Sequence, residues 1–369
     1  MSAELPAAPS RILIVNPFGI GDVLFTTPLL RAVRKAFPKS CIGYLCNRRT
    51  ERVLRDNPHI DELFVYEKDD FIHLWQTSKY AGLKYLTNLL RLIRRFRCDW
   101  VVDLSLGERY SFLLMLMGVK RRVGFNFRGR GRFLTDSFPI DGYQDDHVAE
   151  HYRRLLAFLG INMIDAALEF PVAHEDEQWV GQWLKKRGLT SGELLVGIVP
   201  AGGVSWGINA SFRRWSFEGF AKVADALIEQ HGARVLLFGE SSDSDACAGV
   251  SRLMHHPAID VSGQTSLGQF VSFLGRLGLV VCNDGGPLHL AVSQRVKTVS
   301  VFGPVDPAVY GPYDPGNHTL HQTVFSDELL CRPCYSRFRL PPCPYERACL
   351  TTISAEDVLS ACEQVLTGN

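Results

Sequence analysis

The chain has 369 residues, more than one hydrophobic core usually serves, so two domains are the first expectation. Hydrophobic residues make up 46% of it and charged residues 21%, which are ordinary proportions for a soluble globular protein. A formal net charge of +1 gives no overall attraction to nucleic acid or to an anionic membrane. Any basic surface that matters must therefore be local.

Two features point to the compartment. No apolar run in the sequence approaches the roughly 20 residues that cross a bilayer, so no transmembrane segment is expected. Met1–Ser10 is short and rich in Pro and Ala, without the basic start and apolar centre of a secretory signal. We therefore expect a cytoplasmic protein whose 10 cysteines are mostly reduced.

The first half of the chain alternates short apolar runs with helical stretches. Residues 11–15 (RILIV) have no polar face, which is typical of a parallel strand covered on both sides. A loop over 16–21 leads into a helix predicted from 22 to 37, which Pro38 ends. Further strands are predicted at 41–45, 63–66 and 100–104, and further helices at 48–55 and 82–95.

The second half repeats this plan after a polar stretch at 173–193 that carries helix signals. Strands are predicted at 194–199, 234–238, 259–261, 279–282 and 298–302, and a helix at 217–230. Alternating strands and helices indicate βαβ units, so we predict an α/β protein with two doubly wound parallel sheets. Their carboxyl-end loops are expected to line one cleft between the domains.

These patterns set the expected domain boundaries. We place an N-terminal domain at 1–175, a C-terminal domain at 176–352 and a last helix within 353–369. That helix is amphipathic and starts with the capping pair Ser354 and Asp357. The N-terminal domain is a candidate surface for it to pack on.

Asp22 is the first candidate for chemistry. It follows the first strand in the run Gly19-Ile-Gly21-Asp22, where the glycines let the backbone turn tightly and approach a substrate. A carboxylate there could serve as general base toward a sugar hydroxyl. Equally, an acid at this place could be a plain helix-capping residue, which stabilises a helix by about 1 kcal/mol.

The loop Pro200–Ser205 follows the first strand of the second half. Gly202 and Gly203 could offer backbone N–H groups to a diphosphate, although the loop matches neither a dinucleotide fingerprint nor a Walker A loop. Arg213 and Arg214 come next and could stabilise a departing nucleoside diphosphate. A solvated turn with a core tryptophan after it is the plainer interpretation.

The strongest local pattern is a buried strand that runs into Asp284, Gly285 and Gly286, with Pro287 at the start of a helix. This builds a bare helix N-terminus at the carboxyl end of a strand, which suits an anionic phosphate. His289, near the end of the first helical turn, could contact the same ligand, although a lone histidine on an apolar face is usually a core residue. The turns at 303–307 and 310–313 are structural or shape a nucleobase pocket.

Residues 120–132 are basic with interleaved aromatics, a pattern also seen in single-strand nucleic-acid binders. We expect a basic loop in which Arg128 and Arg130 hold a phosphorylated or carboxylated sugar acceptor, or else a solvated loop. The near-zero net charge argues against a nucleic-acid partner.

Four cysteines cluster near the end of the chain. The first pair has metal-like spacing, but the second pair is too far apart for a zinc ribbon knuckle. A structural metal and redox-labile thiols are both open, and we favour unliganded thiols that form a candidate structural cluster: Cys331, Cys334, Cys343 and Cys349.

Four ordered motifs together resemble glycosyltransferase family 9, which contains the ADP-heptose:lipopolysaccharide heptosyltransferases. They span nearly the whole chain: residues 14–31, Arg213–Trp215, Asn283–His289 and Phe302–Pro307. The Cys331–Cys334 tail also recurs in members of that family.

The resemblance implies a GT-B architecture, with the acceptor in the N-terminal domain and the sugar nucleotide in the C-terminal one. It implies transfer of a sugar, best guess heptose from ADP-heptose, onto a lipopolysaccharide-core or related glycan acceptor with inversion. By similarity, Asp22 is the base and Arg213 meets the donor phosphates. The donor-binding helix start is Asp284, Gly285, Gly286 and His289.

No divalent metal or other cofactor is implied, because basic side chains and helix dipoles take the leaving-group charge. A glycolipid acceptor implies work at the cytoplasmic face of the inner membrane, by peripheral contact. One departure is Gly285, which stands where many members carry Ser or Thr. It leaves open a transferase using another sugar nucleotide, while a non-hydrolysing nucleotide-sugar epimerase and a non-catalytic nucleotide-binding protein are the alternatives from other classes.

Overall fold

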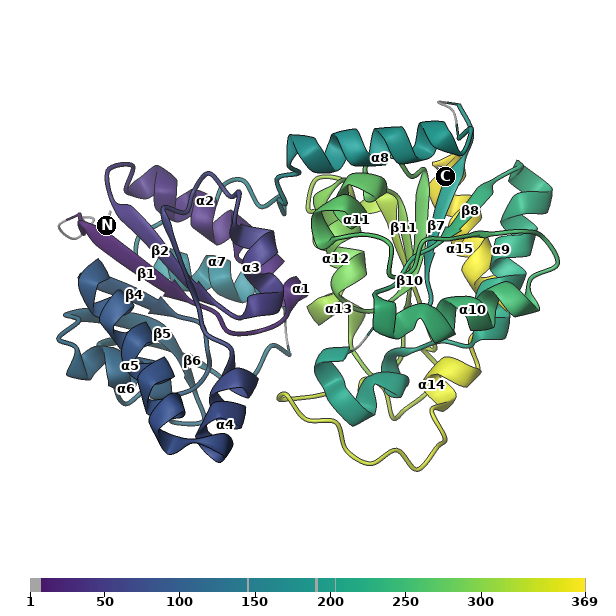
Figure 1. Cartoon of the computed structure of the whole chain (residues 1–369). Coiled ribbons are helices and arrows are strands. Elements are labelled where there is room, and N and C mark those ends of the chain that lie inside the picture. The colour runs from purple at the N-terminus through teal and green to yellow at the C-terminus, as the bar shows by residue number, and fades with distance from the viewer. Residues whose placement is uncertain (1–7, 145, 190–191, 203, 369) are drawn as a thin grey trace. The chain divides into compact units, whose positions relative to one another are not determined.

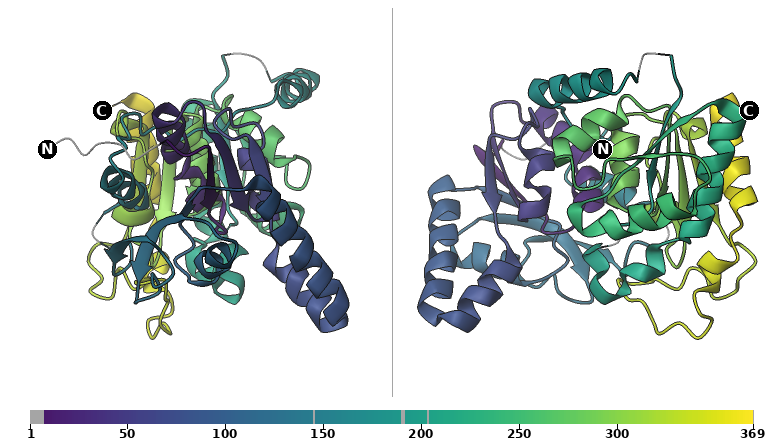
Figure 2. Two further views of the ribbon diagram at one scale, coloured as in Figure 1. Left: turned by 90° about the vertical axis from the view of Figure 1, so that its left-hand side faces the viewer. Right: turned by 45° about the vertical axis from the view of Figure 1, so that its right-hand side comes forward.

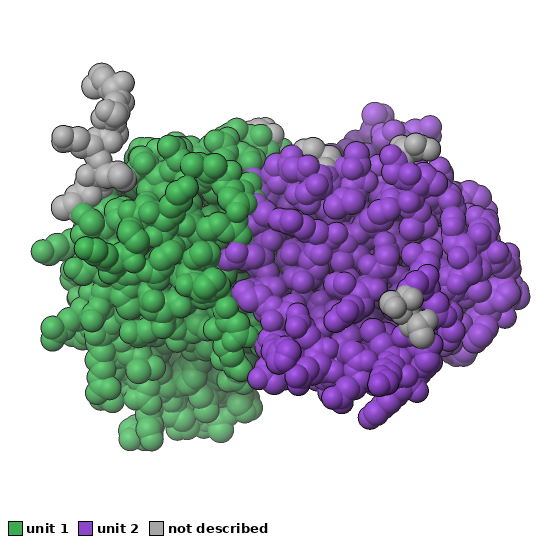
Figure 3. Space-filling model, turned by 90° about the horizontal axis from the view of Figure 1, so that it is seen from above, with its two compact units in different colours: residues 1–166 green, residues 167–369 purple. Residues whose placement is uncertain are grey.

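The computed structural model describes residues 8–144, 146–189, 192–202 and 204–368 (Figure 1). It divides into two compact units, Met1–Ala166 and Ala167–Asn369 (Figure 3). The expected boundary at 175/176 lies nine residues later. The segment before α8 (His174–Lys186) goes with the second unit because Trp183 of α8 packs edge-on against Phe273 and the Phe170 carbonyl accepts a hydrogen bond from Gln294.

Unit 1 is built on one six-stranded parallel sheet in the order β3-β2-β1-β4-β5-β6. Its strands are β1 (Arg11–Val15), β2 (Cys41–Cys46), β3 (Glu62–Val65), β4 (Trp100–Asp103), β5 (Arg121–Phe127) and β6 (Asp136–Ile140). Its helices are α1 (Ile20–Leu24), α2 (Thr27–Ala36), α3 (Arg48–Leu54), α4 (Lys68–Thr77), α5 (Lys79–Phe96), α6 (Arg109–Leu116) and α7 (Val148–Phe158).

Unit 2 has a second six-stranded parallel sheet, ordered β12-β11-β10-β7-β8-β9. Its strands are β7 (Leu195–Val199), β8 (Arg234–Leu237), β9 (Ile259–Asp260), β10 (Leu279–Asn283), β11 (Thr298–Phe302) and β12 (His321–Phe325). Beside α8, its helices are α9 (Phe217–His231), α10 (Ser244–Leu253), α11 (Leu267–Leu274), α12 (Gly286–Ser293), α13 (Pro307–Tyr310), α14 (Ala348–Thr351) and α15 (Ala355–Thr367), with 3-10 segments η1 (Val204–Arg213), η2 (Ser241–Asp243) and η3 (His318–Leu320).

Both sheets have the same doubly wound topology, and helices lie on both faces of each (Figures 1 and 2). The strand order reverses between β1 and β4 in unit 1 and between β7 and β10 in unit 2. Ligands of such sheets bind at that switch point, outside the carboxyl ends of the strands. The topology therefore directs attention to the loops that follow these four strands.

The apolar strand runs form the cores. β1, β7, β10 and β11 are almost entirely buried, as strands covered on both faces must be. In unit 1, Ile93 and Phe96 of α5 and Leu114 of α6 join one cluster with Leu13 and Val101 of the sheet. The α5 and α6 helices therefore cover the same face of this sheet.

Two expected elements differ from the structure. The helix predicted over 22–37 is two helices, because Pro28 opens α2 and the hydroxyl of Thr26 binds the Val23 carbonyl at 2.6 Å. The basic stretch 120–132, expected as a loop, is strand β5 as far as Phe127, because Val123 and Phe125 are buried in the sheet. Only its last residues form a turn.

The last helix, α15, packs against α9, β11 and β12, so it completes the core of unit 2. Its capping pair is present as expected: Ser354 Oγ accepts from the Asp357 backbone N–H at 3.1 Å, and Asp357 Oδ2 accepts from the Ser354 N–H at 2.9 Å. Among the described residues, no helix is both long and apolar enough to span a membrane.

Candidate active site

The loop after β1 places Asp22 at the switch point of unit 1. Asp22 is in the first turn of α1, and its Oδ2 accepts a hydrogen bond from the Gly19 N–H at 3.2 Å. The capping interpretation of Asp22 is thus realised in the structure. The residue is only half-buried, so it caps the helix without being enclosed in the core.

Two buried asparagines hold this loop. Asn16 donates from Nδ2 to the Asp22 carbonyl at 3.2 Å, and its Oδ1 accepts from the Phe18 N–H at 3.1 Å. Asn47 follows β2 and donates to the Phe18 carbonyl at 2.6 Å. Each residue is at most 7% exposed, so the position of Asp22 is set by amide groups from two neighbouring strands.

The glycines of this loop act differently from the expectation. Gly21 lies inside α1, and Gly19 caps it at φ −77°, so neither needs the left-handed region. A Cβ built on Gly19 would lie 3.6 Å from Asp22 Oδ2, an ordinary contact distance. Because neither glycine has a side chain, the backbone beside the Asp22 carboxylate stays uncovered.

Asp103 is a second acid at this switch point, which the sequence patterns did not indicate. It ends β4 in register with Val15 of β1, is 3% exposed, and its Oδ1 accepts from the Ser105 N–H at 3.0 Å. Oδ2 is buried with no hydrogen-bond partner among the described residues. Burial raises the pKa of Asp103 to about 6 against hydrogen bonds from Ser105 and Ser111 that lower it.

Arg128 and Arg130 lie in the turn that follows β5, at the same carboxyl edge as Asp22. Both are exposed, and both guanidinium groups stack on Phe127, at 4.8 Å and 5.9 Å from the ring centroid. Arg132 pairs with Glu108 at 2.8 Å. The turn therefore presents two cations at this edge of sheet 1.

The carboxyl edge of the second sheet collects the expected donor-side residues. Gly202 follows β7 at φ +111°, and its carbonyl accepts from Arg214 Nε at 2.9 Å. Gly285 caps α12 at φ +151°, a backbone conformation that L side chains rarely adopt. Gly286 opens that helix. Gly203, the other expected donor-side glycine, lies outside the described residues.

Arg213 and Asp284 form a buried pair at this edge. Arg213 Nε donates to Asp284 Oδ2 at 2.8 Å, and Nη2 lies 2.5 Å from Oδ1. The Asp284 side chain is 1% exposed and that of Arg213 12%. Burial raises the pKa of Asp284 although Arg213 lowers it. The Arg213 guanidinium also stacks on Trp206 at 4.8 Å.

Asn283 joins the loops of this edge, which the sequence analysis did not foresee. Its Oδ1 accepts from the Trp215 N–H at 2.8 Å, and its Nδ2 donates to the carbonyls of Pro200 and Ala201 at 2.8 Å and 3.2 Å. One amide thus fixes the segment after β7, the segment after η1 and the end of β10. Asn16, Asn47, Asp103 and Asn283 share one signal, a polar residue directly at the end of a buried apolar run.

His289 is 4% exposed on α12 between Leu288 and Leu290, so the structure places it within the core side of that helix.

The four cysteines near the end of the chain have come together. Cys349 is buried. Burial is the main cause that raises the pKa of its thiol to about 11, and the nearby thiols are a smaller cause in the same direction. All four are free thiols. Among the described residues, no group of three His, Cys, Asp or Glu side chains is arranged to hold a metal ion.

Residues 86–338 match the profile of glycosyltransferase family 9 (heptosyltransferase), which is more than half of the chain. The chain belongs to glycosyltransferase family 9. It is therefore a glycosyltransferase, and the resemblance, the enzyme class and the α/β fold of GT-B type expected from the sequence are confirmed.

Similar proteins agree with this membership. The chain is 23% identical over 94% of its length to lipopolysaccharide heptosyltransferase 3 of Escherichia coli K12, covering 95% of that protein. It is 26% identical over 97% of its length to lipooligosaccharide heptosyltransferase 2 of Campylobacter jejuni, covering 99% of it.

Solved structures give the same picture for the fold. A glycosyltransferase of family 9 from Veillonella parvula has a TM-score of 0.81 at 27% identity, with 98% of each chain covered. The E. coli ADP-heptose lipopolysaccharide heptosyltransferase II has a TM-score of 0.72 at 19% identity, with 97% of this chain and 99% of that one covered.

Proposed function

We propose that this family 9 glycosyltransferase transfers heptose from ADP-heptose to a lipopolysaccharide-core acceptor with inversion. The curated relatives are lipopolysaccharide or lipooligosaccharide heptosyltransferases, and an E. coli relative has been solved with ADP and with ADP-2-deoxy-2-fluoro heptose. The observation that carries the proposal is the half-buried Asp22 at a switch point, in a loop whose backbone carbonyls are held by two buried asparagines.

Asp22 is the proposed base. As the acceptor hydroxyl oxygen attacks the anomeric carbon, its proton passes to the Asp22 carboxylate, and the bond from that carbon to the diphosphate oxygen breaks. The electron pair leaves with ADP. Arg128 and Arg130 lie at the same edge of the sheet, where their charges suit the anionic groups of a lipopolysaccharide-core acceptor.

The donor diphosphate is proposed to lie at the start of α12, where backbone N–H groups and the helix dipole favour an anion. Gly202, Gly203, Gly285 and Gly286 are the backbone positions that we assign to it. We assign His289, which is 4% exposed on α12, to the same donor site.

Only one nitrogen of the Arg213 guanidinium remains for the donor. Its Nε and Nη2 face Asp284, which leaves Nη1 for a phosphate oxygen. We therefore assign Asp284 as a positioning residue that aims Arg213, since a carboxylate 1% exposed does not itself bind an anion. No metal or other cofactor enters this scheme, because these donors meet the charge on the leaving group.

Calorimetry with ADP-heptose, ADP-glucose and ADP, with and without EDTA, tests the donor. Preference for ADP-heptose in the presence of EDTA supports the proposal. ADP binding that does not depend on the sugar favours another sugar nucleotide as the donor. Gly285 leaves this alternative open, because it brings no side-chain hydroxyl to the donor site. Binding that needs a divalent metal contradicts the metal-free scheme.

The Asp22→Asn variant tests the base. We expect turnover on a lipid A–Kdo acceptor to fall at least a thousand-fold, while ADP affinity stays within a few-fold of wild type. Asp69→Asn, an exposed acid in the first turn of α4, is the matched control and should keep its activity. Turnover by Asp22→Asn equal to wild type would remove Asp22 from the mechanism.

A further inference from the structure

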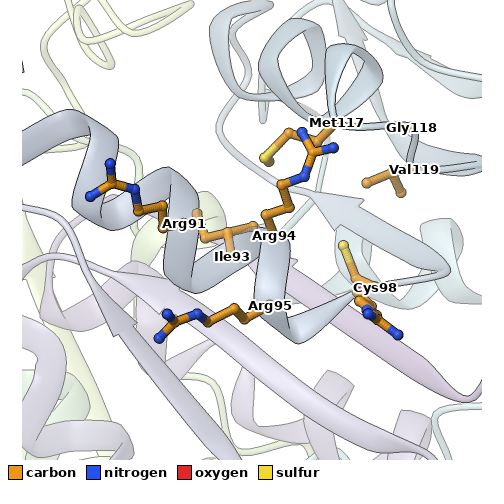
Figure 4. A pocket seen from close by; sticks show the side chains of 9 residues that line it. Arg91, Ile93, Arg94, Arg95, Cys98, Met117, Gly118 and Val119 are labelled. Carbon is orange, nitrogen blue, oxygen red and sulfur yellow. The ribbon is translucent and has the colours of Figure 1, made fainter.

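The amino-end edge of sheet 1 carries an arginine-lined groove. Its volume is about 620 Å³, and the residues that line it include four arginines (Arg91, Arg94, Arg95 and Arg97) and Met117–Val119. Figure 4 shows Arg94 extending toward Met117, while the side chains of Arg91 and Arg95 extend away from it. The lining segments precede β4 and β5, so the groove lies at the opposite strand ends from Asp22 and Arg128. It is separate from the site described above.

The charge of α5 is one-sided. Residues 71–98, from the middle of α4 to the end of α5, contain six Lys or Arg residues and no Asp or Glu, while Asp69 and Asp70 lie at the other end of α4. Lys84, Arg91 and Arg95 are seven and four residues apart on α5, so they project from one side of the helix. The four groove arginines are all exposed, and none pairs with a carboxylate among the described residues.

Large apolar side chains are exposed beside these cations. On α5 Leu83 is 52% exposed, and on α6 Leu116 is 64% exposed. Leu92 is also 52% exposed, but nine residues from Leu83 it projects from the opposite side of α5 and is not part of this surface. Leu116 precedes Met117 of the groove, toward which the Arg94 side chain extends (Figure 4). The neighbouring helix α4, which packs along α5 (Figure 2), exposes Trp75 at 43%.

We propose that this basic-apolar surface of α4, α5 and α6 binds an anionic phospholipid bilayer. The arginine groove takes phosphate headgroups, and the exposed leucines and Trp75 enter the acyl boundary. The proposal deepens the proposed function, on which its purpose rests, since a glycolipid acceptor is held in a membrane. The side chains of this surface take no part in the proposed transfer reaction.

A bilayer fits this surface better than a nucleic acid does. A nucleic acid would engage the arginines but would leave Leu83 and Leu116 against water or phosphate. A bilayer interface accepts cations and aliphatic side chains together, at headgroup depth and just below it. The α5 helix has 18 residues, so it offers a contact about 27 Å long.

Vesicle cosedimentation of the full chain tests the proposal, without donor or acceptor present. We expect at least ten-fold tighter binding to vesicles with 30% phosphatidylglycerol than to pure phosphatidylcholine, and weaker binding in 0.5 M NaCl. Equal binding to both vesicles, or no binding to either, would overturn the proposal.

Two variants locate the contact. Arg94→Gln with Arg95→Gln should weaken anionic-vesicle binding at least ten-fold, and Leu83→Gln with Leu116→Gln should weaken it at least five-fold. The control Lys185→Gln with Lys186→Gln removes the same charge from exposed positions of α8 and should bind like wild type. Vesicle binding by both test variants that equals the control's would contradict the assignment.

Two further arms separate the sources of phosphate. Competition by 5 mM inorganic phosphate, or tighter binding to a duplex oligonucleotide than to anionic vesicles, would overturn the bilayer assignment. Calorimetry with ADP confirms that each variant is folded. Failure of the proposed function appears instead as lost sugar-nucleotide specificity or unimpaired Asp22→Asn turnover, which these vesicle measurements do not involve.

Discussion

Arg213 and Asp284 are 71 residues apart in the sequence, yet their side chains face each other through two guanidinium nitrogens and both carboxylate oxygens. Asp284 lies at the end of β10, and Arg213 ends η1. The pair therefore ties the loop that follows β7 to the start of α12. Two expected donor-binding residues prove to be partners of each other.

Removing one partner of this pair should be costly. We expect Asp284→Asn to lower the free energy of unfolding by about 3 kcal/mol, because it leaves the Arg213 cation buried without its counter-charge. Urea unfolding measures this, and calorimetry should show ADP affinity falling as Arg213 loses its orientation. Arg234→Gln, in an exposed pair with Glu193 at 3.4 Å, is the control and should change stability by less than about 1 kcal/mol. An Asp284→Asn variant as stable as that control would mean that the pair contributes little.

Asp103 should impose a pH dependence on stability. Its pKa is raised from 3.8 to about 6, so the native state binds more protons than the unfolded chain between these values and stability falls as pH rises through them. Asp103→Asn should remove this loss. The variant should match wild type near pH 3 and exceed it at pH 7 by on the order of 3 kcal/mol.

Asp136 provides the control of opposite sign for that experiment. Burial acts to raise its pKa, but hydrogen bonds from Arg121 and Thr135 leave it lowered. Its contribution is therefore present at neutral pH and is lost as pH falls below the ordinary Asp value of 3.8, so Asp136→Asn should be less stable than wild type at pH 7, by an amount that shrinks as pH falls below 3.8. Urea midpoints at a series of pH values measure both variants. Parallel pH profiles for Asp103→Asn and wild type would refute the role given to Asp103.

Asn47 should separate acceptor-side positioning from donor binding. Asn47→Ala removes the donors to the carbonyls of Pro17 and Phe18 and the cap on α3, where Oδ1 accepts from the Thr50 N–H at 3.0 Å. We expect a loss of about 2 kcal/mol in stability and a fall of at least ten-fold in kcat, with ADP affinity unchanged. An equal fall in ADP affinity would show a general loss of structure instead.

Gly285 should resist replacement for a backbone reason. At φ +151° a Cβ meets nothing closer than Pro287 Cδ at 3.9 Å, so Gly285→Ser adds conformational strain without a clash. We expect a loss of about 1–2 kcal/mol in unfolding free energy. Gly181→Ala, within α8 and with open space around it, should instead gain roughly 0.5–1 kcal/mol. A Gly285→Ser variant that is neutral in thermal unfolding would show that this backbone conformation accepts a side chain.

The apolar runs determined the fold by themselves. β1 and β11 have the bounds expected from the sequence, because a run without a polar face can be buried only as a strand covered on both sides. The glycine-rich loops after β1, β7 and β10 were found for the same reason, since each interrupts such a run directly. The order of these motifs along the chain also indicated the glycosyltransferase family.

Only the tertiary structure decided what the polar side chains contact. β5 was missed because its basic, alternating sequence hides the strand, whose burial comes from its place between β4 and β6. The Arg213–Asp284 pair and the three bonds of Asn283 join segments that are distant in sequence, and no local pattern encodes such distances. The sequence therefore determined where the chain turns at the carboxyl ends of its strands. Packing decided which of the residues at those turns hold the loops and which remain for a ligand.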